Sequence, residues 1–148
     1  MEITTTRFGN LEVDPSDIIT FERGILGFEH LRDYILLNFD GKSPFSYLQS
    51  AEDPDLAFVV LDPTAVWPDY RVKLAQEEVA DLGIESDAEA AVLAIVTVPS
   101  EVRLMTANLQ GPLVINPKTR KGKQVVLTGD EYTTRHRVFP PKEDTRSA

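Results

Sequence analysis

The chain has 148 residues, 42% of them hydrophobic, and a formal net charge of −9 at pH 7. This length suits one domain with a real core, and the acidic balance predicts repulsion from nucleic acid and anionic lipid and attraction to basic partners. The absence of cysteine excludes disulfides and thiol chemistry and is compatible with a reducing cytoplasm. The first ten residues have neither a basic start nor a long apolar stretch, so we expect no signal peptide, and no later stretch has the length of a membrane-spanning helix.

Glycine and proline punctuate the chain, and the short segments between them are rich in β-branched, aromatic and leucine residues. This spacing predicts strands rather than helices. Two of the segments contain continuous apolar runs too short for a typical helix, over 56–61 and 92–96, and we predict them as central strands. The predicted strands, most of them expected to pair antiparallel, are Glu2–Thr6, Asn10–Val13, Ile18–Phe21, Tyr34–Asn38, Leu56–Leu61, Tyr70–Lys73, Ala91–Thr97, Leu113–Asn116 and Lys123–Thr128.

Helical signals are few. The best candidate is Gln76–Leu82, which has two acidic residues near its start and Gly83 after its end. A second short helical turn is predicted over Pro44–Gln49. Many short strands with regular turns indicate a mainly β, compact, antiparallel barrel-like or sandwich domain over residues 1–139. Residues 140–148 are polar, charged and open with two prolines, so we predict a disordered tail.

Sequence signatures of catalysis are missing, since the chain has no GxSxG, HExxH or phosphate-binding GxxxxGK motif. One enzymatic alternative is a small hydrolase or isomerase that would combine the acidic cluster Glu52, Asp53 and Asp55 with His30 or His136. Against it, aspartate and proline together usually form turns, and the two histidines are not at metal-ligand spacing. We expect no metal, no cofactor and no small-molecule substrate.

A dense basic stretch, Lys118 to Lys123, lies in a predicted hairpin tip closed by Gly122. It leaves open a direct RNA-binding module that would contact phosphates. The overall acidity and the lack of interleaved aromatic residues favour a solvated hairpin tip instead. We therefore expect no direct nucleic-acid ligand.

Two segments are candidates for partner contact. The first holds Phe45, Leu48 and Gln49, where two apolar residues at spacing three would share a helical face, although apolar residues at this spacing usually face the core. The second is turn-rich and runs into a strand; there Asn108 is expected to cap a turn and Leu109 is also a core candidate. The candidate partner-binding residues are Phe45, Leu48, Gln49, Thr106, Asn108, Leu109 and Gln110.

The turn-rich segment TANLQGPLVINP, residues 106–117, resembles the signature region of the FliW family of flagellar assembly factors. Three further stretches fit the family pattern in the same order: ITFERGILGF from Ile19, SPFSYLQSAEDPD from Ser43 and QVVLTGDEYTTR from Gln124. The resemblance covers the chain up to about Phe139 and implies a compact, barrel-like β fold.

The resemblance also implies a function. FliW-like proteins are non-enzymatic regulators that bind the RNA-binding translational repressor CsrA and also bind flagellin, in the cytoplasm. Free FliW relieves the repression of flagellin messenger RNA, and accumulating flagellin captures FliW, so that flagellin synthesis follows export. Antagonism by occlusion of the RNA site and antagonism by binding elsewhere on CsrA are both physically possible, and the resemblance favours the second.

Overall fold

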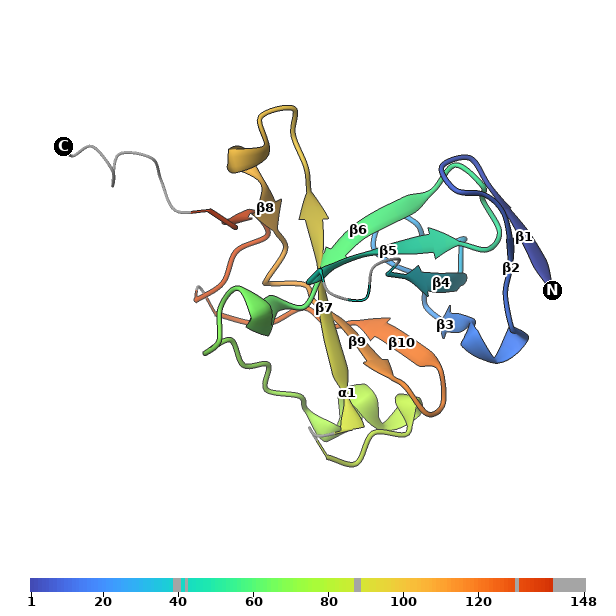
Figure 1. Ribbon diagram of the computed structural model, residues 1–148. Helices are drawn as coiled ribbons and strands as arrows, with labels where there is room; N and C mark the ends of the chain where they lie inside the picture. Colours follow the sequence, from blue (N-terminus) through green and yellow to red (C-terminus); the bar gives the residue numbers. More distant parts are fainter. Residues whose placement is uncertain (39–40, 42, 87–88, 130, 140–148) are drawn as a thin grey trace.

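Seven strands form a closed barrel in the computed structural model, which describes residues 1–38, 41, 43–86, 89–129 and 131–139 (Figure 1). Going round the barrel, each strand is hydrogen-bonded to the next, and the last returns to the first. The barrel strands are β3 (Ile19–Phe21), β4 (Asp33–Leu37), β5 (Phe45–Ser50), β6 (Ala57–Leu61), β7 (Ala91–Thr97), β9 (Leu113–Asn116) and β10 (Lys121–Gln124). The prediction of a mainly β, barrel-like single domain is confirmed.

One pairing closes the barrel and differs from all the others. Strands β3 and β10 run parallel, with Thr20 opposite Lys121 and Phe21 opposite Gly122, whereas every other pairing is antiparallel. Gly122 is buried in this seam, and a Cβ atom at its position would lie 2.6 Å from Cε2 of the Phe21 ring. The expectation that Gly122 closes the hairpin tip is wrong, because the residue lies within β10 and the β9–β10 turn contains Arg120 with φ 59° instead.

Strand β7 is hydrogen-bonded to other strands along both of its edges. One of its edges pairs with β6, and the other pairs first with β9 and then with the short β8 (Thr106–Ala107). A last short strand, β11 (His136–Arg137), adds to the outer edge of β8. Strands β8 and β11 were not predicted, because two residues give no readable periodicity. In Figure 1, α1 lies near one end of β7 and β8 near the other.

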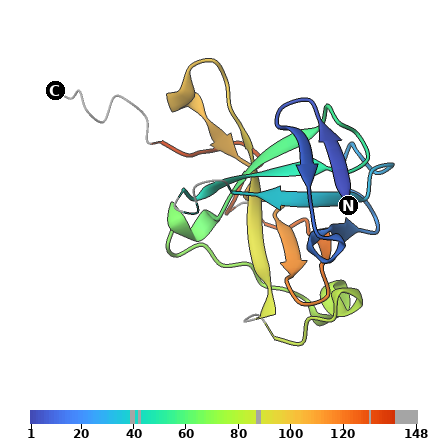
Figure 2. The same ribbon diagram turned by 45° about the vertical axis from the view of Figure 1, so that its right-hand side comes forward.

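The N-terminal hairpin, β1 (Glu2–Thr5) and β2 (Gly9–Glu12), forms a separate two-stranded sheet outside the barrel. Figure 2 shows it crossing the barrel strands. Its contact with the barrel includes a hydrogen bond from Thr6 N to Pro54 O of 2.9 Å and edge-to-face packing of Phe8 on Tyr47, with centroids 5.0 Å apart. Both predicted strands are confirmed to within one residue.

The predicted helix over Gln76–Leu82 is confirmed as one α-helical turn, α1 (Gln76–Val79), followed by a 3₁₀ turn (Ala80–Leu82). Gly83 ends it in the left-handed conformation, with φ 78°, as expected of a helix C-terminus. Short 3₁₀ turns also cover Pro15–Asp17, Pro63–Ala65 and Val102–Leu104.

Three predictions of local structure are wrong, the last of them in part. The segment Pro44–Gln49 is not a helical turn but most of strand β5, which pairs with β4 on one edge and β6 on the other. Within the described residues Tyr70–Lys73 pairs with no strand, and the strand predicted over Lys123–Thr128 ends at Gln124. The predicted tail, residues 140–148, lies outside the described residues.

Three apolar clusters stabilise this arrangement. The first fills the barrel and includes Phe21, Tyr34 and Leu48. The second lies on the β7–β8 side, and the third lies under α1, where Val114 and Val125 meet Val79 and Leu82. The last two clusters are covered by segments outside the barrel sheet, and these segments hold most of the candidate interface.

Candidate protein interface

The three predicted partner-binding residues of β5 differ in accessibility. Leu48 is fully buried in the barrel, on the opposite face of the strand from the half-buried Phe45. The expected shared helical face does not exist, because successive side chains of a strand point to opposite faces. Phe45 packs in the same cluster as Leu109, so the structure does bring the two predicted segments together.

Gln49 has a structural environment that its sequence context did not predict. Its side chain is fully buried, and Nε2 donates to the carbonyl oxygens of Ser50 and Leu56 at 3.0 Å and to those of Asp53 and Pro54 at 3.4 Å. Its Oε1 has no hydrogen-bond partner among the described residues. The amide therefore holds the β5–β6 turn, and a partner protein would not reach it without opening that turn.

The second predicted segment is an insertion along β7. Leu93 pairs with Leu113 and Val96 pairs with Ala107. The chain therefore advances six positions, from Ala107 to Leu113, while β7 covers only three. Asn108 Oδ1 accepts a 2.8 Å hydrogen bond from Gly111 N and closes the insertion, which confirms the expected turn cap. Burial of Leu109 confirms the core alternative for that residue.

Tyr70 ties this insertion to the neighbouring segment. Its hydroxyl donates to Leu109 O at 2.7 Å, and its ring packs on Tyr132 with centroids 4.7 Å apart. Burial raises the pKa of Tyr70 above its ordinary value, and the nearby Tyr132 adds to the effect. The ring of His136 packs edge-to-face on Trp67 at 5.3 Å. These contacts form an aromatic floor beside the insertion.

An open groove of about 670 Å³ lies next to this floor, and we call it the lateral groove. One wall is the extended segment 71–75 and the other is the segment 126–129. Gln110 is the one predicted partner-binding residue that lines it, among the residues described; Thr106 and Asn108 are partly exposed in or beside β8. The groove carries both charges and an apolar side chain, Val126, that is 56% exposed.

A second exposed apolar surface lies at the end of the β7–β8 hairpin. Val98, Val102 and Leu104 are each more than two-fifths exposed there, and Phe139 follows β11, the strand paired to β8. These residues were not predicted as functional, because isolated exposed apolar residues are common on protein surfaces.

The acidic cluster considered for catalysis forms turns. Glu52 Oε2 accepts backbone N–H groups of Arg32 and Asp33 at 2.8 and 2.7 Å, and Asp53 Oδ1 accepts from Asp55 N at 2.9 Å. Asp55 in turn accepts from Thr6 Oγ1. None of these carboxylates lines the lateral groove. Among the described residues, no group of three or more histidine and acidic side chains is arranged to hold a metal.

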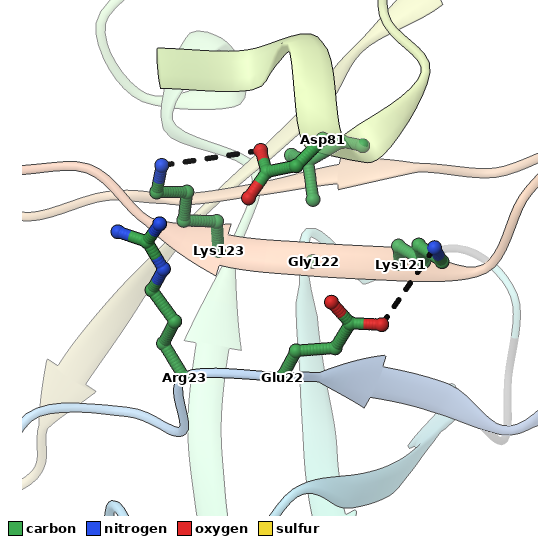
Figure 3. Close-up of a pocket in the computed structure, with 7 residues that line it drawn as sticks. Glu22, Arg23, Asp81, Lys121, Gly122 and Lys123 are labelled. Carbon is green, nitrogen blue, oxygen red and sulfur yellow. Dashed lines mark ion pairs between the residues drawn. The ribbon is translucent and has the colours of Figure 1, made fainter.

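Two of the four cations in the basic stretch considered for RNA binding, Lys121 and Lys123, form ion pairs with carboxylates, as Figure 3 shows. Lys123 Nζ lies 2.6 Å from Glu78 O and 3.9 Å from Asp81 Oδ1, and Lys121 Nζ lies 3.6 Å from Glu22 Oε2. The small cavity at this place, about 10 Å³, is large enough for little more than a water molecule. This arrangement lowers the positive potential that phosphate binding requires.

No helix among the described residues is long and apolar enough to cross a membrane.

Comparison with known proteins identifies relatives along almost the full chain. The chain is 44% identical over 140 residues to the flagellar assembly factor FliW of Moorella thermoacetica, covering 94% of this chain and 89% of that one. It is 46% identical over 139 residues to the FliW of Geobacter sulfurreducens, covering 94% and 87%.

A crystal structure of the flagellar assembly factor FliW superimposes with a TM-score of 0.88 at 39% identity, covering 96% of this chain and 99% of that one. The family model described as FliW protein matches residues 2–138, which includes the barrel, the insertion along β7 and both walls of the lateral groove. The chain therefore belongs to the FliW family of flagellar assembly factors.

Proposed function

We propose that this protein is a regulatory binding protein of flagellar assembly that acts in the cytoplasm. It binds the translational repressor CsrA and antagonises it, and it binds flagellin, so that flagellin synthesis is coupled to export. Membership of the FliW family supports the role in assembly. The two named partners, CsrA and flagellin, are those that the family resemblance implies.

The observation that carries a binding role is the lateral groove. It is open, bordered by extended chain, and lined by charges of both signs around exposed apolar area. Such a surface is suited to binding a polypeptide.

The clearly shifted pKa values of the described residues have structural causes. N–H donors lower the pKa of Asp14 and Glu89, and burial raises the pKa of Tyr34 and Tyr70. Among the described residues, no acid and base are thereby tuned against each other.

The charge balance supports a basic partner. A net charge of −9 accelerates encounter with a basic RNA-binding protein and disfavours phosphate near the bound complex. This contribution weakens as salt screens the charges. Affinity for such a partner should therefore fall as ionic strength rises.

Calorimetric titration with purified CsrA, and separately with monomeric flagellin, tests the proposal. Each titration is made at about 50 and 300 mM salt, a range over which the Debye length falls by a factor of about two. We expect binding to both proteins and weaker binding of CsrA at the higher salt. Addition of flagellin to the CsrA complex, with RNA binding by CsrA as the readout, then tests antagonism. Binding to neither protein would refute the proposed function while leaving the fold and family unchanged.

A further inference from the structure

The wall formed by residues 71–75 has the pattern of a strand without a partner. Side chains alternate along it, with Arg71, Lys73 and Ala75 exposed and Val72 and Leu74 partly buried. Val72 and Leu74 pack against two of the apolar clusters. This period-two pattern is typical of a strand with one buried face.

The backbone of this wall is unpaired. Within the described residues, no N–H group of residues 71–75 donates a hydrogen bond, and no carbonyl of residues 71–74 accepts one. Backbone groups in folded proteins are otherwise almost always paired with protein or water. A segment with a fixed, strand-like side-chain pattern and two free edges is suited to accept another strand.

The opposite wall shows the same property in part. Val125 N donates to Pro112 O at 3.0 Å, and Leu127 N donates to Gln110 O at 2.8 Å. Because N–H groups of an extended chain alternate in direction, those of Val126 and Thr128 point away from this ladder, and neither donates to a described residue. The sequence predicts a strand here as well, but the observed strand β10 ends at Gln124.

The charges of the groove indicate what it would accept. Two cations, Arg71 and Lys73, lie at alternate exposed positions in the middle of one wall, and neither forms an ion pair within the described residues. Acidic side chains lie toward the ends, at Asp69, Glu78 and Glu131. Apolar contact is offered by Val126 and Tyr132.

We infer that the lateral groove binds one extended segment of a partner protein, whose backbone pairs with residues 71–75. The segment carries acidic side chains opposite Arg71 and Lys73 and apolar side chains toward Val126. Backbone pairing supplies affinity without regard to sequence, and the alternating side chains supply preference. This inference rests on the proposed function, because it names the place at which one of the two protein partners is held.

Hydrogen–deuterium exchange of the full chain tests the backbone pairing. Amides of residues 72–75 exchange rapidly in the free protein because they are unpaired, and a bound strand protects the alternate amides that face it. The probes are CsrA and monomeric flagellin, each added at a concentration that saturates the chain by calorimetry. We expect at least tenfold slower exchange of alternate amides within 72–75 with one of them.

A matched pair of charge reversals tests the chemistry of the occupant. Lys73→Glu places a like charge against the acidic segment, and Lys118→Glu makes the same change in net charge in the β9–β10 turn, outside the groove. We expect Lys73→Glu to weaken the complex by about five- to tenfold more than Lys118→Glu. Melting curves of both variants should match the parent, because neither side chain makes a hydrogen bond or ion pair in the described structure.

The outcomes separate the two proposals. Binding of either partner with protection over 72–75 and selective loss in Lys73→Glu supports the groove. Binding with unchanged exchange over 72–75 overturns the groove and leaves the proposed function standing. Binding of neither partner overturns both. Protection that instead depends on the concentration of this chain alone identifies a second copy as the occupant and also overturns the inference.

Discussion

Replacement of Gly122 by alanine should destabilise the seam that closes the barrel. An alanine Cβ would lie 2.6 and 2.7 Å from Cε2 and Cζ of Phe21, whereas comfortable carbon contacts are about 3.5–4.0 Å. The Phe21 ring is fully buried and packs edge-to-face on Tyr34, with centroids 5.6 Å apart, so it cannot move freely. Overpacking of this kind costs about 1–3 kcal/mol. For a domain of this size, 2 kcal/mol corresponds to a melting temperature lowered by about 4–8 °C.

A double-mutant cycle distinguishes this clash from a general loss of stability. Urea unfolding is measured for the parent, Gly122→Ala, Phe21→Leu and the double variant. Because leucine lacks the ring atoms that meet the new Cβ, the alanine penalty should largely disappear in the double variant, which gives a coupling energy above about 1 kcal/mol. An unfolding free energy of Gly122→Ala within about 0.5 kcal/mol of the parent, or additive single effects, would refute the reasoning.

Three other predictions concern polar side chains. Asn108→Ala removes the 2.8 Å hydrogen bond to Gly111 N and should lower the unfolding free energy by about 1 kcal/mol; an unchanged urea midpoint would contradict the cap. Tyr70→Phe removes the donor to Leu109 O and should lower the unfolding free energy by about 1–2 kcal/mol. Tyr34→Phe removes a hydroxyl without a partner among the described residues and should leave stability unchanged or raise it. Thermal melts in which Tyr34→Phe is the less stable of the two variants would disprove this. Burial raises the pKa of Tyr34 to about 12. Since tyrosine in the unfolded chain ionises near pH 10, the unfolded state binds fewer protons between pH 10 and 12, and stability should fall there, less steeply in Tyr34→Phe.

The strands with strong local patterns were predictable from the sequence. The continuous apolar runs gave β6 and β7, and β7 and β9 have the predicted bounds. All of β9 and the central residues of β6 and β7 are buried or partly buried, so the local apolar pattern and the tertiary burial agree. The closing seam was not predictable, because nothing in β3 or β10 alone indicates a parallel partner in the other.

The error over Pro44–Gln49 has a physical cause. Phe45 and Leu48 at spacing three fit a helical face, but they also fit a strand whose two faces are both covered. Such a strand is buried at Leu48 by the barrel core and at Gln49 by the β5–β6 turn. Short apolar patterns do not separate these cases. Pairing with β4 and β6 decides between them, and that information is not local.

The candidate site could be predicted only in part. Gln110 lines the lateral groove, but Leu48, Gln49 and Leu109 are inaccessible. The sequence predicts strands over parts of both groove walls, at Tyr70–Lys73 and Lys123–Thr128, because these short segments are rich in strand-forming residues. It does not predict the groove, because a sequence shows that a segment is suited to pairing and does not show whether its partner belongs to the same chain.

The parallel seam also constrains how the chain folds. Phe21 and Gly122 pair across about a hundred residues of sequence, so loop closure between them is entropically costly and every hairpin from β4 to β9 can form earlier. During synthesis, β3 has no seam partner until nearly the whole domain has left the ribosome, and its edge is open to wrong pairing until then. Formation of the seam should therefore be the slow, late step of folding, and a chain interrupted before Lys121 should populate an open sheet rather than a smaller barrel.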